Sequence, residues 1–284
     1  MTTMMGQRLE ETGHPRGKLE VRLSRELVSL LSEQLYTSPL KAIEELVVNA
    51  FDAEAKTCRV QLPTTLETSA TEPIVVFDDG IGMDFEGLGD LWHIGHSSKR
   101  TEAVERQHNR KQIGKFGIGK LATYAIARHI TYLTKTKNGP VLLATLDYEQ
   151  FHDDPTGGGE AVPLAVVELS SEAVRDDNGL IAIFEGIGVD PSDLLRLNNH
   201  WTLVLLESFK PKVAELMRGR LRWVLSTAMP LRAGFQLFLE GREVESSKEN
   251  FEQLVSFPVG DVPQTEWRRS RGKPVRSGSQ TGRR

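Results

Sequence analysis

Apolar and polar positions in the first part of the chain follow two different periods. LEVRL (19–23) alternates apolar and charged residues, which is the period-two pattern of a strand. In residues 25–36 and in LKAIEELVVNAFDAEA (40–55), apolar residues recur at helical spacing, which predicts two helices. Short apolar runs predict two further strands, CRVQL (58–62) and IVVFDD (74–79).

The rest of the pattern is richer in strands than in helices. Residues 84–113 lack apolar periodicity and are predicted to form a long loop, and loops of that length usually serve a function. Helices are predicted over 120–129 and roughly over 211–228. The predicted strands are HITYLTK (129–135), VLLATLDY (141–148), AVVELS (165–170), LIAIFEG (180–186), TLVLLE (202–207) and FQLFLEG (235–241).

Helices are interspersed singly among these strands rather than in strict β-α-β alternation. This order favours an α+β sandwich, in which one mixed sheet carries helices on one face, over a doubly wound fold. Residues 1–18 are polar and are predicted to form a flexible arm, followed by an ordered domain over 19–245. Periodicity fades in 246–284, which predicts a basic, disordered tail.

Composition and charge narrow the class of protein. The 284 residues are 39% hydrophobic and 26% charged, which is ordinary globular composition. The single cysteine, Cys58, excludes an intramolecular disulfide framework and a cysteine-cluster metal site, and it favours a reducing, cytoplasmic location. No apolar run approaches the roughly 18 residues of a membrane span, so we expect no membrane partner.

The net charge of −4 is unevenly distributed. Residues 268–284 contain seven Lys or Arg and no acid, which leaves 28 basic and 39 acidic residues, or −11, for 1–267. An acidic body does not attract nucleic acid over its whole surface, so only the tail could bind it. A solvated, disordered end is the favoured interpretation of the tail, and a nucleic-acid contact is the alternative.

Three groups of residues carry candidate chemistry, and the first lies in the predicted helix 40–55. Glu45, Asn49 and Asp52 are spaced at i, i+4 and i+7, so they form a polar stripe on one face. A solvated helix face is the simpler interpretation. Asn is a poor helix former in mid-helix, however, and Ala or Lys would suit a merely exposed position better. The neighbouring Glu44 has apolar partners at these spacings and lies outside the stripe.

The second and third groups are rich in glycine. DDGIGM (78–83) follows a predicted strand, and its glycines permit positive φ and close approach of a ligand to the backbone. GKFGIGK (114–120) opens a predicted helix, where backbone N–H groups can bind phosphate. Each motif is weak alone: the first is also an ordinary Asp-Gly turn, and the second matches neither a P-loop nor a full GxGxxG.

The order ExxxNxxDA, DxGxGM, GxxGxG resembles the GHKL ATPase superfamily, which includes gyrase B subunits, ninety-kilodalton heat-shock chaperones, sensor histidine kinases and MutL. LYTSPLKAIEELVVNAFDA resembles the chaperone and MutL form of the first motif. HIGHSSK (93–99) resembles a motif that leads into the lid of MutL and MORC-type members. Thr202, which opens the predicted strand TLVLLE, resembles the threonine that comes last in the adenine site of this superfamily. The resemblance covers about 19–245 and implies the two-layer Bergerat fold with a mostly antiparallel sheet.

The resemblance also implies roles for single residues. Asn49 would bind Mg²⁺ through its side-chain oxygen, and Glu45, one turn away, would orient or deprotonate the attacking water. Asp78 would accept a hydrogen bond from the adenine amino group, supported by Thr202. The resemblance thus implies that Glu45 is the catalytic residue and Asn49 the metal ligand. The residues that the resemblance places at the nucleotide are Asn49, Asp52, Asp78, Gly80, Gly82, Met83, Lys99, Gly114, Lys115, Phe116, Gly117, Ile118, Gly119, Lys120 and Thr202.

The function implied by the resemblance is an ATPase that binds Mg·ATP under a lid over 84–116. It would hydrolyse ATP slowly to ADP and phosphate and thereby drive a conformational or dimerisation switch. A nucleotide-gated interaction module with negligible turnover is the alternative. A histidine-type protein kinase is a third, which the glutamate at position 45 disfavours. Relatives dimerise when ATP closes the lid, so an ATP-dependent homodimer is one expected partner.

This sequence departs from the family pattern in two ways. Trp201 stands where the family often has Gly, which affects the expected shape of the adenine pocket. The glutamate-bearing branch also takes a catalytic lysine from a following domain, so a downstream domain or a protein partner is expected to supply it.

Overall fold

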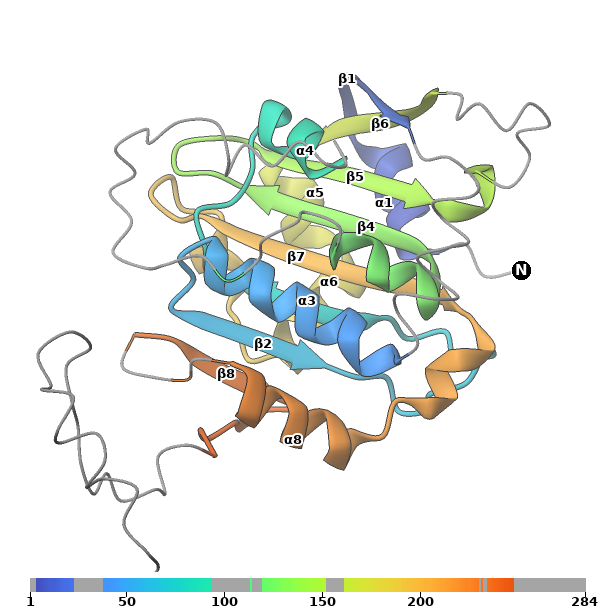
Figure 1. Ribbon diagram of the computed structural model, residues 1–284. Coiled ribbons are helices and arrows are strands. Elements are labelled where there is room, and N and C mark those ends of the chain that lie inside the picture. The colour runs from blue at the N-terminus through green and yellow to red at the C-terminus, as the bar shows by residue number, and fades with distance from the viewer. Residues whose placement is uncertain are drawn as a thin grey trace, which may run out of the picture. The chain divides into compact units, whose positions relative to one another are not determined.

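The computed structural model of the protein describes residues 4–22, 38–92, 113, 119–151, 161–229, 231 and 234–247. They form a nine-stranded sheet with the order β1-β6-β5-β4-β7-β3-β2-β8-β9 (Figure 1). Among the described strands only β2 and β8 pair in parallel, so the sheet is mixed and mostly antiparallel. The strands are β1 His14–Arg22, β2 Thr57–Gln61, β3 Ile74–Asp78, β4 Ala127–Lys135, β5 Val141–Asp147, β6 Ala161–Leu169, β7 Trp201–Phe209, β8 Gln236–Leu239 and β9 Arg242–Glu243.

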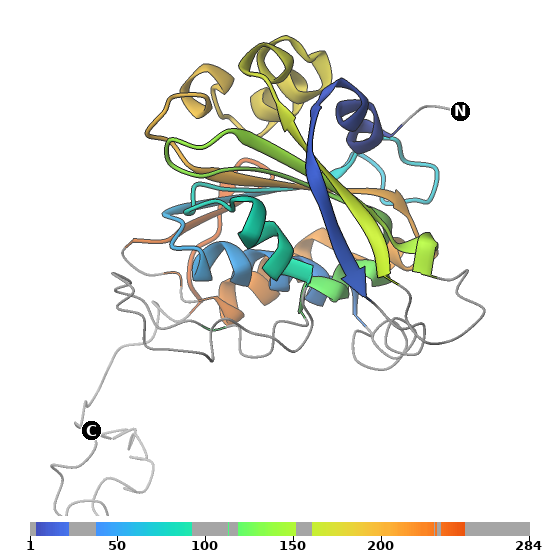
Figure 2. The ribbon, with the colours of Figure 1, turned by 90° about the horizontal axis from the view of Figure 1, so that it is seen from above.

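Helices pack on both faces of this sheet (Figure 2). The first face is covered by α3 Pro39–Asp52, α4 Phe85–Trp92, the 3₁₀ helix η2 Gly119–Ala125 and α8 Arg218–Ala228. The second face is covered by a second helical layer, which consists of α1 Met5–Thr12, α5 Ser171–Asp176, α6 Asn178–Gly186 and α7 Pro191–Leu194. Two short 3₁₀ helices, η3 Tyr148–Phe151 and η4 Pro211–Glu215, lie in connections. The predicted α+β sandwich with one mixed sheet is confirmed, and a second helical layer adds to the expected helices on one face.

The second layer arises where the sequence pattern predicts other structures. Residues 180–186 form most of α6 rather than a strand, because Leu180 and Phe184 lie four apart and bury together. The Asp177 side chain caps this helix by accepting the Leu180 N–H at 2.9 Å. The Ile residues of LIAIFEG favoured a strand, but the cap and the i, i+4 pair determine the structure.

The predicted flexible arm over 1–18 also differs from the structure. Met5–Thr12 forms α1, and β1 begins at His14. Leu9 is buried against the second face, and the Glu207 carboxylate accepts the N–H groups of Met5 (2.7 Å) and Gly6 (3.0 Å) at the start of α1. Only long-range contacts of this kind hold so short a helix, so its own sequence pattern does not predict it.

The remaining differences concern boundaries. Residues 85–92, predicted as loop, form α4, and the predicted helix over 120–129 is the 3₁₀ helix η2, which gives way to β4 at Ala127. The predicted helix over 211–228 is divided into η4 and α8. The predicted helix over 25–36 and the tail from residue 248 lie outside the described residues. No described helix has both the length and the apolar character needed to cross a membrane.

Candidate functional site

Helix α3 lies along the first face of the sheet (Figure 1). It carries the polar stripe. Glu45, Asn49 and Asp52 are only partly exposed, and nine other residues of the helix are buried. The Asp52 carboxylate accepts the N–H of Ile113 at 2.8 Å, which places this residue against the end of the stripe. The stripe is therefore a contact surface within the fold rather than a fully solvated face.

Glu45 shares a cation with its neighbour. Lys41 Nζ lies 3.1 Å from Glu45 Oε1 and 2.9 Å from Glu44 Oε1, and both carboxylates are about equally exposed, at 19% and 18%. Burial lowers the pKa of Lys41, but the hydrogen bonds to the two glutamates outweigh it and leave that pKa above its usual value. The helical spacing places only Glu45 in the polar stripe, but in the structure Glu44 and Glu45 contact the same lysine.

Asp78 ends β3 with a buried side chain that is 6% exposed. Burial raises its pKa to about 7, the Gly80 N–H bonded to its Oδ1 at 2.9 Å lowers it, and the nearby charge of Asp79 raises it further. Asp79 has a different role, because its Oδ1 accepts the N–H groups of Lys56 and Thr57, each at 2.7 Å. Of the two aspartates, only Asp78 has its carboxyl buried beneath α3.

At the two glycines after Asp78, neighbouring atoms lie so close to the backbone that a side chain would not fit. A Cβ on Gly80 would lie 2.6 Å from Asp78 Oδ1 and 2.7 Å from the carbonyl oxygen of Ala53, just beyond α3. A Cβ on Gly82, whose φ is +68°, would lie 2.1 Å from the carbonyl oxygen of Lys135. The loop therefore runs between the end of α3 and the end of β4 with no room for larger residues.

Thr202 lies directly opposite Asp78 in the antiparallel pairing of β7 with β3. Directly opposed residues share a face of the sheet, so the hydroxyl and the carboxyl lie side by side under α3. Trp201 points to the other face, where its ring packs against Phe77 and Phe184 and its Nε1 donates to the Leu194 carbonyl at 3.0 Å. Its bulk therefore does not occupy the space beside Asp78, despite the departure from the family pattern.

The structure brings part of the predicted site together. Asp78, Gly80, Gly82, Met83 and Thr202 lie at one end of the sheet, and the end of α3 contacts this loop through the Ile81 N–H, bonded to the Ala53 carbonyl at 2.9 Å. Lys99 and the residues Gly114, Lys115, Phe116, Gly117 and Ile118 lie outside the described residues. Gly119 and Lys120 begin η2.

Three further residues surround this loop that the motifs do not identify. The Met83 N–H donates to Thr134 Oγ1 at 2.8 Å, and His200 Nδ1 lies 2.6 Å from the Gly80 carbonyl. Lys135 Nζ donates to the carbonyls of Arg196 (3.0 Å), Leu197 (3.3 Å) and Asn199 (2.8 Å). Only the strand register, which joins segments far apart in the chain, brings these residues to the loop.

The oxygen donors of α3 suit a magnesium ion that is held mainly by a bound nucleotide and by water. Among the described residues there is no group of three or more His, Cys, Asp or Glu that could hold a metal ion. Asn49 offers one neutral, hard oxygen on α3. Mg²⁺ usually takes one or two protein oxygens and completes its shell with water and substrate phosphates, so Asn49 fits that role.

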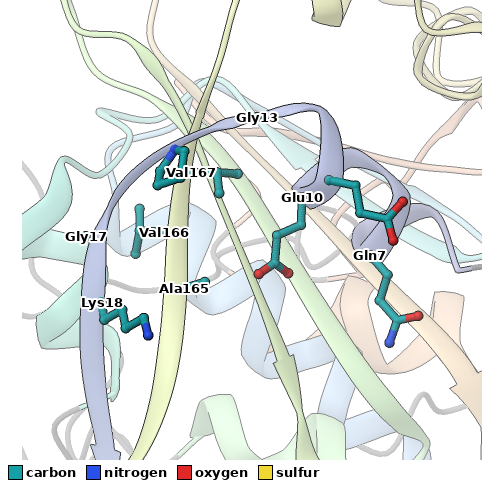
Figure 3. A pocket seen from close by; sticks show the side chains of 10 residues that line it. Gln7, Glu10, Gly13, Gly17, Lys18, Ala165, Val166 and Val167 are labelled. Atoms are coloured by element: carbon teal, nitrogen blue, oxygen red, sulfur yellow. The ribbon is translucent and has the colours of Figure 1, made fainter.

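A separate cavity of about 700 Å³ lies between α1 and the β1–β6 pair (Figure 3). Glu10 and Lys18 are among its polar lining residues, and burial raises the pKa of Glu10. None of the described residues that are predicted to bind nucleotide lines it. It is therefore distinct from the site beneath α3.

Comparison with known proteins identifies the family of the chain. A family model described as "Histidine kinase-, DNA gyrase B-, and HSP90-like ATPase" matches residues 36–179, about half of the chain. The match includes α3, the Asp78 loop and the glycine-rich segment, so the resemblance inferred from the motifs is confirmed.

Individual relatives match over shorter stretches. A protein of Herpetosiphon aurantiacus named as a type II restriction enzyme, HgiDII, is 33% identical over 121 residues, 42% of this chain and 18% of the relative. ATPase morc-1 of Caenorhabditis elegans is 30% identical over 119 residues, 42% of this chain and 12% of the relative. Chaperone protein HtpG of Rhodopseudomonas palustris (strain BisA53) is 27% identical over 127 residues, 39% of this chain and 20% of the relative. The matched region thus spans a fifth or less of these relatives.

Proposed function

Because this chain belongs to the family of histidine kinase-, DNA gyrase B- and HSP90-like ATPases, we propose that it binds Mg·ATP beneath α3 and slowly hydrolyses it to ADP and phosphate. The observation that carries the proposal is the pairing of Asp78 with Thr202 at the sheet end covered by α3. A buried carboxyl beside a hydroxyl, next to a glycine loop packed closely against the ends of α3 and β4, suits a flat base bearing an amino group.

The chain's own residues have separate roles in this proposal. The Asp78 carboxyl accepts a hydrogen bond from the adenine amino group, and Thr202 supports that carboxyl. Asn49 holds Mg²⁺ together with the phosphates, and the ion supplies neutralisation of phosphate charge. Glu45 orients the attacking water and accepts its proton. Gly117 and Gly119, with nearby backbone N–H groups, hold the phosphates, and Lys99, Lys115 and Lys120 are the candidate charge partners.

The Lys41–Glu45 ion pair favours a second candidate, a nucleotide-gated interaction module with negligible turnover. The Glu45 carboxylate, which would accept the proton of the attacking water, is held by Lys41 Nζ at 3.1 Å. Turnover then requires Glu45 to leave Lys41. Both candidates include the lid over 84–116, of which α4 is the described helix, and an ATP-dependent dimer. They also include a lysine supplied by a downstream domain or partner. Steady-state phosphate release distinguishes the two candidates.

Calorimetric titration with ATP, ADP and GTP, with and without Mg²⁺, tests the binding proposal. We expect ATP and ADP to bind and GTP to bind far more weakly, because guanine presents a carbonyl oxygen to Asp78 where adenine presents a donor. Equal binding of GTP and ATP, or no binding of ATP, would contradict the proposal.

Variants of α3 test the division of roles. Glu45→Ala should bind ATP like the wild type but lose a factor of roughly 10² to 10⁴ in phosphate release. Asn49→Ala should lose Mg²⁺-dependent binding itself. Glu44→Ala is the matched control, because it removes the other carboxylate that contacts Lys41 and should retain both properties. If Glu45→Ala and Asn49→Ala impair ATP binding equally, the proposed roles are wrong.

A further inference from the structure

A buried hydroxyl lies next to the proposed base site. Thr134 on β4 is opposite Thr202 in the β4–β7 pairing, and Thr202 is opposite Asp78 in the β3–β7 pairing. The three side chains therefore form one row across neighbouring strands on the face covered by α3. Thr134 is fully buried, and Asp78 and Thr202 are 6% and 7% exposed.

The hydroxyl of Thr134 connects the two sides of this site. It accepts the N–H of Met83, which belongs to the glycine loop DDGIGM (78–83), at a distance of 2.8 Å. On the β7 side it lies 3.2 Å from the Trp201 carbonyl and 3.3 Å from the Thr202 hydroxyl. A hydroxyl has one hydrogen to donate, so with Met83 as donor its own hydrogen goes to Trp201 or Thr202. In either arrangement the Thr134 hydroxyl restricts the orientation of the Thr202 hydroxyl.

The next residue strengthens the same connection. The carbonyl of Lys135 occupies the space where a side chain on Gly82 would lie. Its Nζ donates to carbonyls of the turn that precedes Trp201 and Thr202, including that of Asn199 at 2.8 Å. The end of β4 thus contacts both the glycine loop and the start of β7.

We infer that Thr134 is a positioning residue for base recognition: its hydroxyl fixes the Met83 backbone and the Thr202 hydroxyl so that Asp78 meets the amino group of adenine. This inference rests on the proposed function. The proposed function assigns the phosphates and the attacking water to other residues, Asn49 and Glu45 among them. Loss of the Thr134 hydroxyl should therefore weaken recognition of the base and leave the phosphate half of the site unaffected.

Three variants and two ligands test this inference. Thr134→Val keeps the shape and removes the hydroxyl, and Thr134→Ser keeps the hydroxyl. Thr131→Val is the matched control: Thr131 is also fully buried on β4, but its hydroxyl pairs with Thr145 at 3.1 Å, away from the site. Titration with Mg·ATP measures the whole site, and titration with magnesium tripolyphosphate measures the phosphate half alone.

We expect Thr134→Val to bind ATP about tenfold more weakly and tripolyphosphate within about twofold of the wild type. Thr134→Ser and Thr131→Val should bind ATP within about threefold of the wild type. Hydrogen exchange of the Met83 amide should accelerate in Thr134→Val and not in Thr131→Val. Where Thr134→Val lowers the folded fraction, Thr134→Cys replaces it, because a thiol is a weak acceptor of similar size.

Wild-type binding of ATP together with unchanged affinity in Thr134→Val would overturn this inference alone. Equal losses of ATP and tripolyphosphate affinity would also overturn it, since they indicate a general structural effect. Failure of the wild-type chain to bind ATP at all would overturn the proposed function itself.

Discussion

At the scale of single residues, Asp78 links the proposed site to folding stability. Burial raises the pKa of its carboxyl to about 7 from an ordinary value of 3.8. At a pH between these two pKa values, the carboxyl stays protonated in the folded state and is ionised in the unfolded state. The free energy of unfolding therefore falls as pH rises from about 4 to about 7, by up to about 4 kcal/mol, and then levels off.

Substitution of Asp78 by Asn should remove this pH dependence. Urea unfolding at several pH values between 4 and 8 measures it in both proteins. We expect Asp78→Asn to gain stability relative to the wild type as pH rises. A constant difference between the two proteins across this range would show that the Asp78 pKa is close to its ordinary value in the folded state.

The same substitution tests base recognition. Asn at position 78 can present a donor to the adenine amino group, so ATP affinity should fall roughly tenfold to a hundredfold. Asp79→Asn is the matched control, because Asp79 Oδ1 accepts the backbone N–H groups of Lys56 and Thr57 and Asn retains an acceptor oxygen. Calorimetry of both variants decides the point, and equal affinities would exclude Asp78 as the base contact.

The sequence predicts these residues better than it predicts their surroundings. Asp78 and Gly82 lie in a motif with a local signature, an Asp-Gly turn after a strand, whereas only the family resemblance indicates Thr202. The role of Thr134 and the opposite orientation of Trp201 depend on the pairing of β7 with β3 and β4. That register follows from packing of the whole sheet, which a local pattern does not contain.

At the scale of elements, the strands are predicted more reliably than the helices of the second layer. Alternation and β-branched runs locate most of the strands, whereas α1 depends on partners elsewhere in the chain, and the strand-like composition of α6 conceals its cap and its i, i+4 pair. Arg8 of α1 forms a two-point ion pair with Asp177, which also caps α6. One carboxylate therefore joins two elements that local periodicity does not predict.

Removal of that carboxylate should destabilise the protein through both elements. Asp177→Ala should lower the free energy of unfolding by about 1–3 kcal/mol, because it removes a helix cap and a half-buried ion pair. Asp190→Ala is the control, since Asp190 caps α7 through the Ser192 N–H at 2.8 Å. Urea unfolding should show a smaller loss in Asp190→Ala. A loss in Asp177→Ala no larger than in the control would contradict the double role.

Helix α1 offers a steric test of its own position. A Cβ on Gly6 would lie 2.0 Å from Thr131 Oγ1 and 2.9 Å from Thr145 Oγ1. Gly6→Ala should therefore cost about 1–3 kcal/mol despite the better helix propensity of Ala. Gln7→Ala, at an exposed neighbouring position, should change stability by less than about 0.5 kcal/mol. If Gly6→Ala is as stable as the wild type, α1 does not pack there.

At the scale of the whole molecule, strand β7 packs against both helical layers of the sheet. Successive residues of β7 face opposite sides: Trp201 packs with Phe184 of α6, and Thr202 lies beside Asp78 under α3. Packing in the second layer thus holds the strand from which the proposed site is built. A ligand that binds beneath α3 should consequently stabilise the fold as one unit against unfolding.

Thermal unfolding measures this stabilisation. Free Mg·ATP at a hundred times its Kd adds about 2.7 kcal/mol to the free energy of unfolding if it binds only the folded state. For a domain of this size that corresponds to a rise in Tm of roughly 5–11 °C. Asn49→Ala, or removal of Mg²⁺ with a chelator, should abolish most of the rise, whereas Glu44→Ala should retain it. An equal rise with ATP in the presence of chelator would exclude the proposed magnesium bridge through Asn49.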